Sequence, residues 1–461
     1  MLKKSNDETE RSDSSDTINA MPTKELFIKI LTRDIELIPA IIDLVDNCGD
    51  GARRIRENRI GAKPFDGLWA RLQITPEQFC ISDNCGGMSI DIAKKYAFRF
   101  GRAHDAPAIK HSVGEFGVGM KRAIFKIGNQ FKVTSTTINS RFVVEVDINE
   151  WAKNLDWKYD FSDLQDETKF PLDSVGTTIE INKLHDDISN SFKLSNFFSE
   201  LKEELQMKLQ DVVSKGLSIT LNGIPIESEP LVLISDKRLA PAYRELSFPE
   251  KGKNPVKVKL FCGLGKSEEP EQAGWHVFCN GRLILEGDKS EVTGWGVEKL
   301  GGIKIPGFHN QYNNLRGFAY FDSDDPGKLP WNTTKTGLNS DSSVYRAVKM
   351  EMVKLMRPVV DFLNKLSQEK KDAKETGEEG QLDKIITESK YAEIGKISTR
   401  ETFKQPEVAR KQVALGPLMQ KIQYEIQYKK AQKAKSRLKA TSWKEMGIKT
   451  FNYFYDAEIG N

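Results

Sequence analysis

The chain has 461 residues, which is enough for two or three domains and too long for one compact core. Hydrophobic residues make up 38% of it and charged residues 29%, a composition typical of a globular protein and not of a disordered one. The formal net charge is only +3, so the overall charge gives no reason to expect nucleic-acid binding, and no apolar run is long enough to predict a membrane span.

The first residues and the cysteines indicate a cytoplasmic protein. The opening segment is polar and lacks the apolar stretch of a secretory signal, so we expect residues 1–20 to form a disordered tail. The five cysteines are odd in number, and they show neither a CxxC pair nor a metal-binding spacing. They therefore predict free thiols in a reducing compartment.

The first elements predicted along the chain are one long helix and a set of strands. Apolar residues recur at steps of three and four between Pro22 and Ile60, which predicts a helix. Short strands at residues 72–75 and 79–82 flank a turn at Pro76-Glu77. Three further strands are predicted, at residues 131–136, 142–146 and 176–181.

The following half of the chain predicts a second α+β unit. A helix is expected over residues 194–213, followed by a hairpin whose turn is Asn222-Gly223. The later elements are strands at residues 256–261, 275–279 and 315–321 and a helix at residues 342–366. The stretch after them is highly charged and poor in apolar residues, which predicts a linker or a solvated helix. These patterns divide the chain into domains at 21–190 and 191–366, a linker at 367–390 and a C-terminal segment at 391–461.

Four polar residues form a stripe on the first predicted helix. Asp43, Asp46, Asn47 and Asp50 lie three or four residues apart and so share one side of it. A solvated acidic face would explain this pattern, but hard oxygen ligands gathered in this way also suit Mg²⁺. Gly49 and Gly51 of the same helix each lower the stability of the helix by about 1 kcal/mol relative to alanine. Their presence indicates that another group approaches the helix closely there.

Two glycine-containing motifs follow this helix. The run from Asp83 to Met88 comes at the end of a strand, and by itself it is typical of an ordinary turn. The run from Gly114 to Lys121 has Gly-x-x-Gly-x-Gly spacing, which lets backbone N–H groups converge on an anion. It is not a dinucleotide-binding fingerprint, because no strand directly precedes it, and the chain has no GxxxxGK[ST] phosphate loop.

The order of these motifs, with Gly176-Thr177 opening a later strand, resembles the GHKL ATPase superfamily. This superfamily contains gyrase B, the ninety-kilodalton heat-shock chaperones, MutL, MORC proteins and histidine kinases. The resemblance extends over about residues 22–185. It implies a Bergerat-type ATPase domain, with helices on a mixed sheet, that binds ATP and Mg²⁺.

The resemblance implies roles for the matching residues of the first helix. Asn47 would coordinate Mg²⁺ through its side-chain oxygen, and Asp50 would belong to the same cofactor-binding stripe. Asp43 would be the catalytic residue that positions or deprotonates the attacking water, although many relatives carry glutamate there. Because aspartate is one methylene shorter, hydrolysis could be slow, or absent with binding intact. Asp46 is the competing base by proximity.

The second motif would bind the base of the nucleotide. Asp83 would accept a hydrogen bond from the adenine amino group, with support from Thr177. Gly87 and Met88 would line the adenine and ribose pocket. Cys85 stands where relatives have the first glycine of this motif, so the next glycine would make the turn.

The third motif would form the lid over the phosphates. Gly114, Gly117 and Gly119 would wrap the triphosphate, and Lys121 is a candidate for a direct phosphate contact. The three glycines would then serve to bring backbone amides close to an anion.

The second α+β domain, predicted at residues 191–366, favours one branch of the superfamily. Residues 327–336 resemble the transducer loop of MutL, MORC and chaperone proteins, and Lys335 matches its catalytic basic residue. Residues 278–284 resemble the strand-turn-strand segment upstream of that loop in MutL and MORC-like proteins. A histidine kinase is not expected, because no histidine sits in an upstream helix with an adjacent acidic residue and downstream heptads. The five histidines are His104, His111, His185, His276 and His309. The expected fold class is therefore α+β, with a Bergerat-type ATPase domain, an α+β transducer domain and a helical C-terminal segment.

The C-terminal segment suggests partners without deciding between them. Residues 421–440 are basic and predict a helix, which is either solvated or contacts the phosphate backbone of DNA. The aromatic stretch that follows predicts docking on this chain, on a second protomer or on another protein. Its aromatic residues are Trp443, Phe451, Tyr453, Phe454 and Tyr455.

Two functions remain open from the sequence. One is a MORC/MutL-like ATPase whose lid closure and ATP-dependent homodimerisation act on DNA or on a protein client. The other is a nucleotide-binding sensor or scaffold of the same fold that does not hydrolyse ATP.

Overall fold

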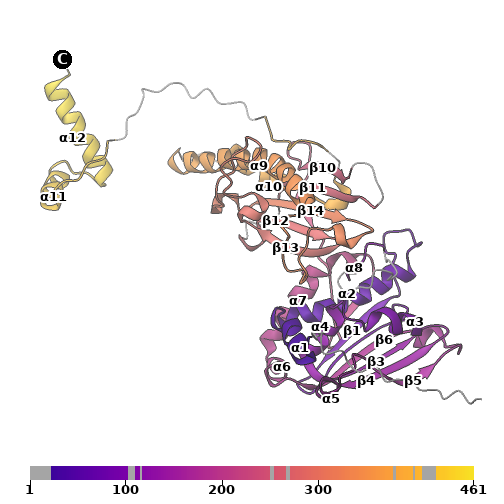
Figure 1. The fold of residues 1–461 in the computed structure, drawn as a ribbon. Coiled ribbons are helices and arrows are strands. Elements are labelled where there is room, and N and C mark those ends of the chain that lie inside the picture. Colours follow the sequence, from indigo (N-terminus) through magenta and orange to yellow (C-terminus); the bar gives the residue numbers. More distant parts are fainter. Residues whose placement is uncertain are drawn as a thin grey trace, which may run out of the picture. The chain divides into compact units, whose positions relative to one another are not determined.

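The computed structural model describes residues 22–101, 110–114, 117–249, 254–265, 270–376, 380–397, 400–407 and 422–460. The predicted tail of residues 1–20 lies outside these ranges. The chain divides into two compact units, the first ending at Pro406 and the second beginning at Glu407 (Figure 1). Among the described helices, none combines the length and the apolar character needed to cross a membrane.

A mixed sheet is the centre of the first domain. Within the described residues it has eight strands in the order β5-β4-β3-β6-β2-β1-β7-β8. Neighbouring strands are antiparallel except β1 and β7, which run parallel. The strands are β1 (Trp69–Ile74), β2 (Phe79–Asp83), β3 (Gly128–Thr136), β4 (Arg141–Asp147), β5 (Phe161–Gln165), β6 (Gly176–Leu184), β7 (Ser218–Leu221) and β8 (Ile224–Ile226).

Helices pack on one face of this sheet, with α2 and α4 side by side (Figure 1). The helices of the domain are α1 (Lys24–Arg33), α2 (Leu37–Ile55), α3 (Ile90–Ile92), α4 (Gly119–Ile127), α5 (Ile148–Lys153), α6 (Asp186–Ser191), α7 (Ser195–Lys208) and α8 (Gln210–Ser214). The single helix predicted over residues 22–60 is therefore two helices, separated at residues 34–36. Pro39 falls in the first turn of α2, where it removes no intrahelical hydrogen bond.

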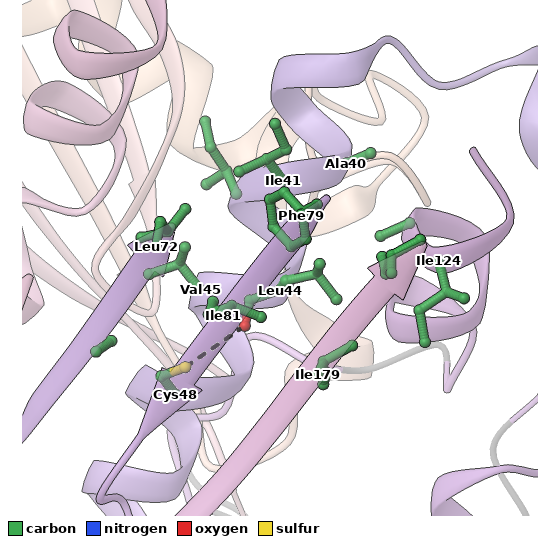
Figure 2. Close-up of a cluster of buried hydrophobic side chains, with 14 of the residues drawn as sticks. Ala40, Ile41, Leu44, Val45, Cys48, Leu72, Phe79, Ile81, Ile124 and Ile179 are labelled. Carbon is green, nitrogen blue, oxygen red and sulfur yellow. Dashed lines mark hydrogen bonds between the residues drawn. The ribbon is translucent and has the colours of Figure 1, made fainter. Parts of the chain in front are cut away.

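One face of α2 supplies the centre of the hydrophobic core. Ile41, Leu44 and Val45 are at most 1% exposed. They lie over side chains of β1 and β2 such as Leu72 and Phe79, as Figure 2 shows. Each fully buried side chain of this size stabilises the fold by about 1.5–3 kcal/mol, so this face of α2 is fixed on the sheet.

The first domain extends further along the chain than the sequence predicts. Residues 191–226 were expected to open the second domain, but β7 pairs with β1 and β8 pairs with β7. Leu201 and Leu205 of α7 are fully buried in the same hydrophobic core as α2. We place the boundary after Ile226. The pairing of β7 with β1 joins residues far apart in the sequence, and a local pattern cannot indicate it.

The second domain is a five-stranded sheet in the described residues, with strand order β10-β11-β14-β12-β13. Helix α9 packs on it through side chains such as Val348, Met352 and Val359, all fully buried. The elements are β9 (Val232–Ile234), β10 (Ala242–Phe248), β11 (Val256–Leu264), β12 (Gly274–Cys279), β13 (Arg282–Asp288), β14 (Leu315–Asp322), α9 (Ser343–Thr376), α10 (Gln381–Glu388) and β15 (Tyr391–Glu393).

The charged stretch predicted as a linker at residues 367–390 is mostly helical. Helix α9 continues through it to Thr376, and α10 follows. The C-terminal segment was expected from residue 391, but β15 pairs with β9, so this part of it belongs to the first unit. The solvated-helix alternative for this stretch therefore describes it better than a linker.

The C-terminal unit, which begins at Glu407, contains a short pair of helices, α11 (Tyr428–Arg437) and α12 (Trp443–Glu458). Ala431, Ala440 and Met446 form its small buried cluster. The aromatic residues of α12 stay exposed, for example Phe451 at 50% and Tyr453 at 75%. Their expected docking partner thus remains a prediction.

Two glycines of α2 give a test of this packing. A Cβ atom on Gly51 would lie 2.7 Å from the backbone oxygen of Cys85, whereas one on Gly49 would lie 3.3 Å from a methyl group of Val212. Alanine at position 51 should lower the free energy of unfolding by about 1–3 kcal/mol, because the overpacking outweighs the gain of about 1 kcal/mol in helix propensity. Gly49→Ala is the matched control, because a side-chain methyl can shift. Equal midpoints for G51A and G49A in urea denaturation would contradict this close approach.

Candidate functional site

The polar face of α2 is buried and not solvated. Asp43, Asp46 and Asp50 are 2%, 4% and 6% exposed, respectively. A buried carboxylate needs a cation or hydrogen-bond donors to offset its lost hydration. Each of the three has such partners, and several come from outside the helix.

Asp43 joins the two domains. Its Oδ2 accepts a hydrogen bond from Arg122 Nη2 of α4 at 2.7 Å, and its Oδ1 lies 3.1 Å from Lys335 Nζ of the second domain. Burial alone would favour the neutral acid, but the charges of Lys335 and Arg122 outweigh it and lower the pKa of Asp43. The carboxylate is therefore ionised at neutral pH.

Lys335 bridges two carboxylates of α2. Its Nζ also lies 3.4 Å from Asp46 Oδ2. Burial alone would favour the neutral amine, but Asp43 and Asp46 outweigh it and raise the pKa of Lys335, which keeps the ammonium charged. A tight turn presents this side chain, because Lys335 has a positive φ of 55° and its N–H donates to the carbonyl of Asn332.

Asp50 holds the start of the glycine run. Its carboxylate accepts hydrogen bonds from the N–H groups of Val113 at 2.9 Å and Gly114 at 2.8 Å, and it pairs with Arg53 at 3.0 Å. Burial raises the pKa of Asp50 in spite of these partners. Because Asp50 accepts hydrogen bonds from backbone N–H groups, it holds the loop in place beside α2.

The second domain holds the same loop from the other side. The side-chain Nδ2 of Asn280 donates to the carbonyl of Ser112 at 2.9 Å, and Arg53 Nη2 donates to the carbonyl of Asn280 at 3.1 Å. His111 Nε2 lies 3.3 Å from Asp324 Oδ1. The entry to the glycine run is therefore tied both to α2 and to the second domain.

The rest of the glycine run leads directly into α4. Gly117 has a φ of 64°, and Gly119 is the first residue of α4. A Cβ atom on Gly119 would lie 3.3 Å from Asp43 Oδ2, so glycine allows α4 to begin beside this carboxylate. Residues 115 and 116 fall outside the described residues.

Lys121 points into the protein. Its Nζ donates to the carbonyl oxygens of Ala97, at 2.9 Å, and Gly117, and burial lowers its pKa to about 7. The phosphate contact expected from the sequence would require this side chain to leave both carbonyls. The adjacent Arg122 is the basic residue of α4 that reaches Asp43.

The base-binding residues expected from the sequence lie together on neighbouring strands. Asp83 of β2 pairs with Thr177 of β6 in the sheet register. The Oγ1 of Thr177 lies 2.9 Å from Ser135 Oγ, which accepts a hydrogen bond from the N–H of Met88 at 2.7 Å. Burial raises the pKa of Asp83, although its Oδ1 accepts a hydrogen bond from the N–H of Cys85 at 2.7 Å.

The turn after Asp83 uses two glycines. Gly86 and Gly87 have φ values of 91° and 62°, which favour glycine. A Cβ atom on Gly87 would lie only 2.2 Å from the carbonyl oxygen of Thr136. Cys85 does not need a positive φ, because Gly86 and Gly87 provide both left-handed conformations.

Asn47 is the polar residue of the stripe that remains exposed. Its Oδ1 lies 3.8 Å from where a Cβ on Gly114 would be, so it borders the glycine run. In the part of the chain that the structure describes, no group of three or more His, Cys, Asp or Glu side chains could hold a metal ion. The residues present fit Mg²⁺ only as an ion bound by one protein oxygen, with water and substrate phosphates completing its shell, which is the usual arrangement.

Residues 35–177 match the family model described as histidine kinase-, DNA gyrase B-, and HSP90-like ATPase. The first domain is a GHKL-type ATPase domain. The match supports ATP binding by this domain, and the expected α+β fold class with an ATPase domain and a helical C-terminal segment is confirmed. The transducer assignment of the second domain stays a prediction. The match ends at Thr177 and leaves outside both Lys335 and Arg282, whose Nε lies 3.8 Å from Asp46 Oδ2. No curated protein matches the chain.

Several residues of the site of this ATPase domain were not found from the sequence. They are Arg53, Arg122, Ser135, Asn280 and Arg282. Arg122 directly follows Lys121, the residue expected to contact phosphate, and Asn280 and Arg282 fall in the strand-turn-strand segment, in which no site residue was predicted. Burial identifies Arg122 and Arg282, because arginine is rarely fully buried unless it is paired.

The buried ammonium of Lys121 predicts a pH effect on stability. Between its pKa of about 7 in the folded protein and the ordinary value of 10.5, the unfolded chain binds a proton that the folded chain does not. This group should therefore make the free energy of unfolding rise with pH, by at most about 1.4 kcal/mol per pH unit over that window. The contribution is lost as the pH falls to 7.

Lys121→Met should remove this dependence. Measured by thermal unfolding, the wild type should gain stability relative to K121M between pH 7 and pH 10. Lys126→Met on the same helix controls for the loss of a lysine. A difference in stability between wild type and K121M that stays constant with pH would contradict the lowered pKa of Lys121.

Proposed function

We propose that the protein is an ATP hydrolase in which Asp43 positions or deprotonates the attacking water and Lys335 stabilises charge on the terminal phosphate. The observation that carries this proposal is the contact of 3.1 Å between Lys335 Nζ and Asp43 Oδ1. It brings a basic residue of the second domain to the acidic residue of the GHKL-type domain. Such charge stabilisation is the main contribution of proteins to phosphoryl transfer.

Each neighbouring residue has a role in this proposal. Arg122 orients Asp43 by its hydrogen bond of 2.7 Å and helps to keep it ionised. Asp50 fixes the first amides of the lid, and Asn47 would hold Mg²⁺, which would supply charge neutralisation to the phosphates. Gly114, Gly117 and Gly119 bring the backbone close to the triphosphate.

At the other end of the nucleotide, Asp83 and Thr177 would recognise the adenine, with Gly87 and Met88 lining the pocket. Their arrangement around Ser135 supports this role. Lys121 contributes by holding Ala97 and Gly117, unless the nucleotide draws it out.

The second domain is a transducer in this proposal, and the protein is MORC/MutL-like. Release of Lys335 from Asp43 and Asp46 toward the terminal phosphate would couple nucleotide binding to the position of the second domain. ATP-dependent homodimerisation would follow, and the cycle would act on DNA or a protein client in the cytoplasm. Basic α11 could contact DNA, and the exposed aromatic residues of α12 could bind a protein.

A non-hydrolysing nucleotide sensor is the second candidate. It is favoured by the state of Asp43, whose two oxygens are each held by a cation and which is 2% exposed. The resemblance implies glutamate at this position in many relatives, and the shorter side chain of aspartate would add to this argument. Turnover could therefore be slow.

Variants of Asp43 separate the two candidates. Asp43→Asn should abolish phosphate release while ATP binding persists, because the amide cannot act as a base. Asp43→Glu should keep or raise turnover, and it preserves the charge beside Lys335. Asp91→Asn, whose side chain is 79% exposed, is the matched control.

Phosphate release and molecular mass should be followed together, with Mg²⁺ and either ATP or a non-hydrolysable analogue. A larger mass with the analogue and phosphate release from ATP would support the ATPase. Binding without release, in wild type and D43E alike, would favour the sensor. Absence of binding would contradict both.

Asp83→Asn tests the base-binding end. Loss of a hydrogen bond to a charged acceptor costs about 1.5–3 kcal/mol, so ATP and ADP affinities should fall alike, by about tenfold to a hundredfold. Asp163→Asn on β5, which is exposed, is the control. Calorimetric titrations that show an effect on ATP alone would place Asp83 near the phosphates instead.

A further inference from the structure

The ion cluster between α2 and the second domain contains more positive than negative charge. Arg122, Arg282 and Lys335 provide three cations, and Asp43 and Asp46 provide two carboxylates. All five are at most 6% exposed. Burying a cation without a counter-charge is costly, so the excess charge would favour binding of an anion.

Arg282 is the cation of this cluster with the fewest hydrogen bonds. Its Nε and Nη1 are buried and have no hydrogen-bond acceptor among the described residues. Asp46 Oδ2 lies 3.8 Å from Nε, which is an ion-pair distance and too long for a hydrogen bond. Arg122 Nε also lacks an acceptor in this part of the chain. The cluster thus has N–H donors that an additional acceptor could satisfy.

The backbone holds Arg282 in this position. It is the first residue of β13 and follows the turn at Asn280-Gly281. Asn280 is bonded to Ser112 and to Arg53 of the ATPase domain, at 2.9 and 3.1 Å. A Cβ atom on Gly281 would lie 2.3 Å from Asp211 Oδ2, so the turn is closely packed. The position of the backbone that carries Arg282 is therefore fixed by contacts within the protein.

We propose that Arg282 is a second cation from the second domain that binds the terminal phosphate of ATP beside Lys335. This inference rests on the proposed function, because it takes ATP as the ligand of the site. A guanidinium presents a planar fork of N–H donors to phosphoryl oxygens. Two donors of Arg282, Nε and Nη1, have no acceptor among the described residues, and they point in different directions, so each could bind a separate oxygen. Because ADP lacks the terminal phosphate, Arg282 would favour ATP over ADP.

The alternative role of Arg282 is to neutralise Asp46 only. In that case removing Arg282 would lower stability and would change the affinities for ATP and ADP equally. A ratio of the two affinities therefore distinguishes the roles, and activity alone does not.

The experiment uses the full-length protein in Mg²⁺ at constant ionic strength. Affinities for a non-hydrolysable ATP analogue and for ADP are measured by calorimetry, together with thermal unfolding. Arg282→Gln should weaken the analogue by about tenfold to a hundredfold and leave ADP unchanged. Arg238→Gln, at a partly exposed position of the second domain paired with Glu388, should change neither.

Arg282→Lys covers the case in which R282Q unfolds. Lysine keeps the positive charge but lacks the planar N–H donors of the guanidinium. R282K should therefore still lower the preference for the ATP analogue over ADP. An unchanged preference in R282Q or R282K, with wild-type binding intact, would overturn the role of Arg282 and leave the proposed function standing. A wild type that binds neither nucleotide would overturn the proposed function itself.

Discussion

The contact of Lys335 with Asp43 and Asp46 is the interaction on which the arrangement of the site depends. Two carboxylates one turn apart on a buried helix face repel each other and lose hydration, and the ammonium of Lys335 contacts both and offsets part of this cost. Arg122 and Arg282 contribute further positive charge. Removing one partner of such a buried pair typically costs about 3–5 kcal/mol. The position of the second domain against α2 is thus set by charge as well as by packing.

Helix α2 is consequently shared by two interfaces. Its apolar face packs on the sheet of the GHKL-type domain (Figure 2). Its polar face meets the second domain and the start of the glycine run. Asp50 and Arg53, one turn apart, bond to the start of the glycine run and to Asn280 respectively. A displacement at any one of these contacts must be transmitted through the same helix, because its opposite face is held by the core.

Much of the fold followed from local patterns. The motif after Asp83 predicted its turn, because Gly86 and Gly87 adopt positive φ values that favour glycine. The domain boundary did not follow, because β7 joins β1 across more than a hundred residues of sequence. The break between α1 and α2 was also missed, since apolar spacing continues through it.

The case of Lys121 and Arg122 shows why some site residues could not be predicted from the sequence. These neighbours lie about 100° apart around α4, so only one can face α2. The sequence favoured Lys121 by its place after the glycines, whereas the structure directs Arg122 to Asp43 and Lys121 to backbone carbonyls. Which side of a helix faces a partner is a tertiary property, and neither residue type nor spacing contains it.

Helix α9 begins at Ser343, eight residues after Lys335, and continues for 34 residues. A helix of that length is a rod of about 50 Å, so a tilt of about 10° at its base moves its far end by roughly 9 Å. Pro358 lies within it and is the point at which such a rod would bend first. The second domain therefore contains a long helix, packed on its sheet, that begins close in sequence to the lysine that contacts Asp43.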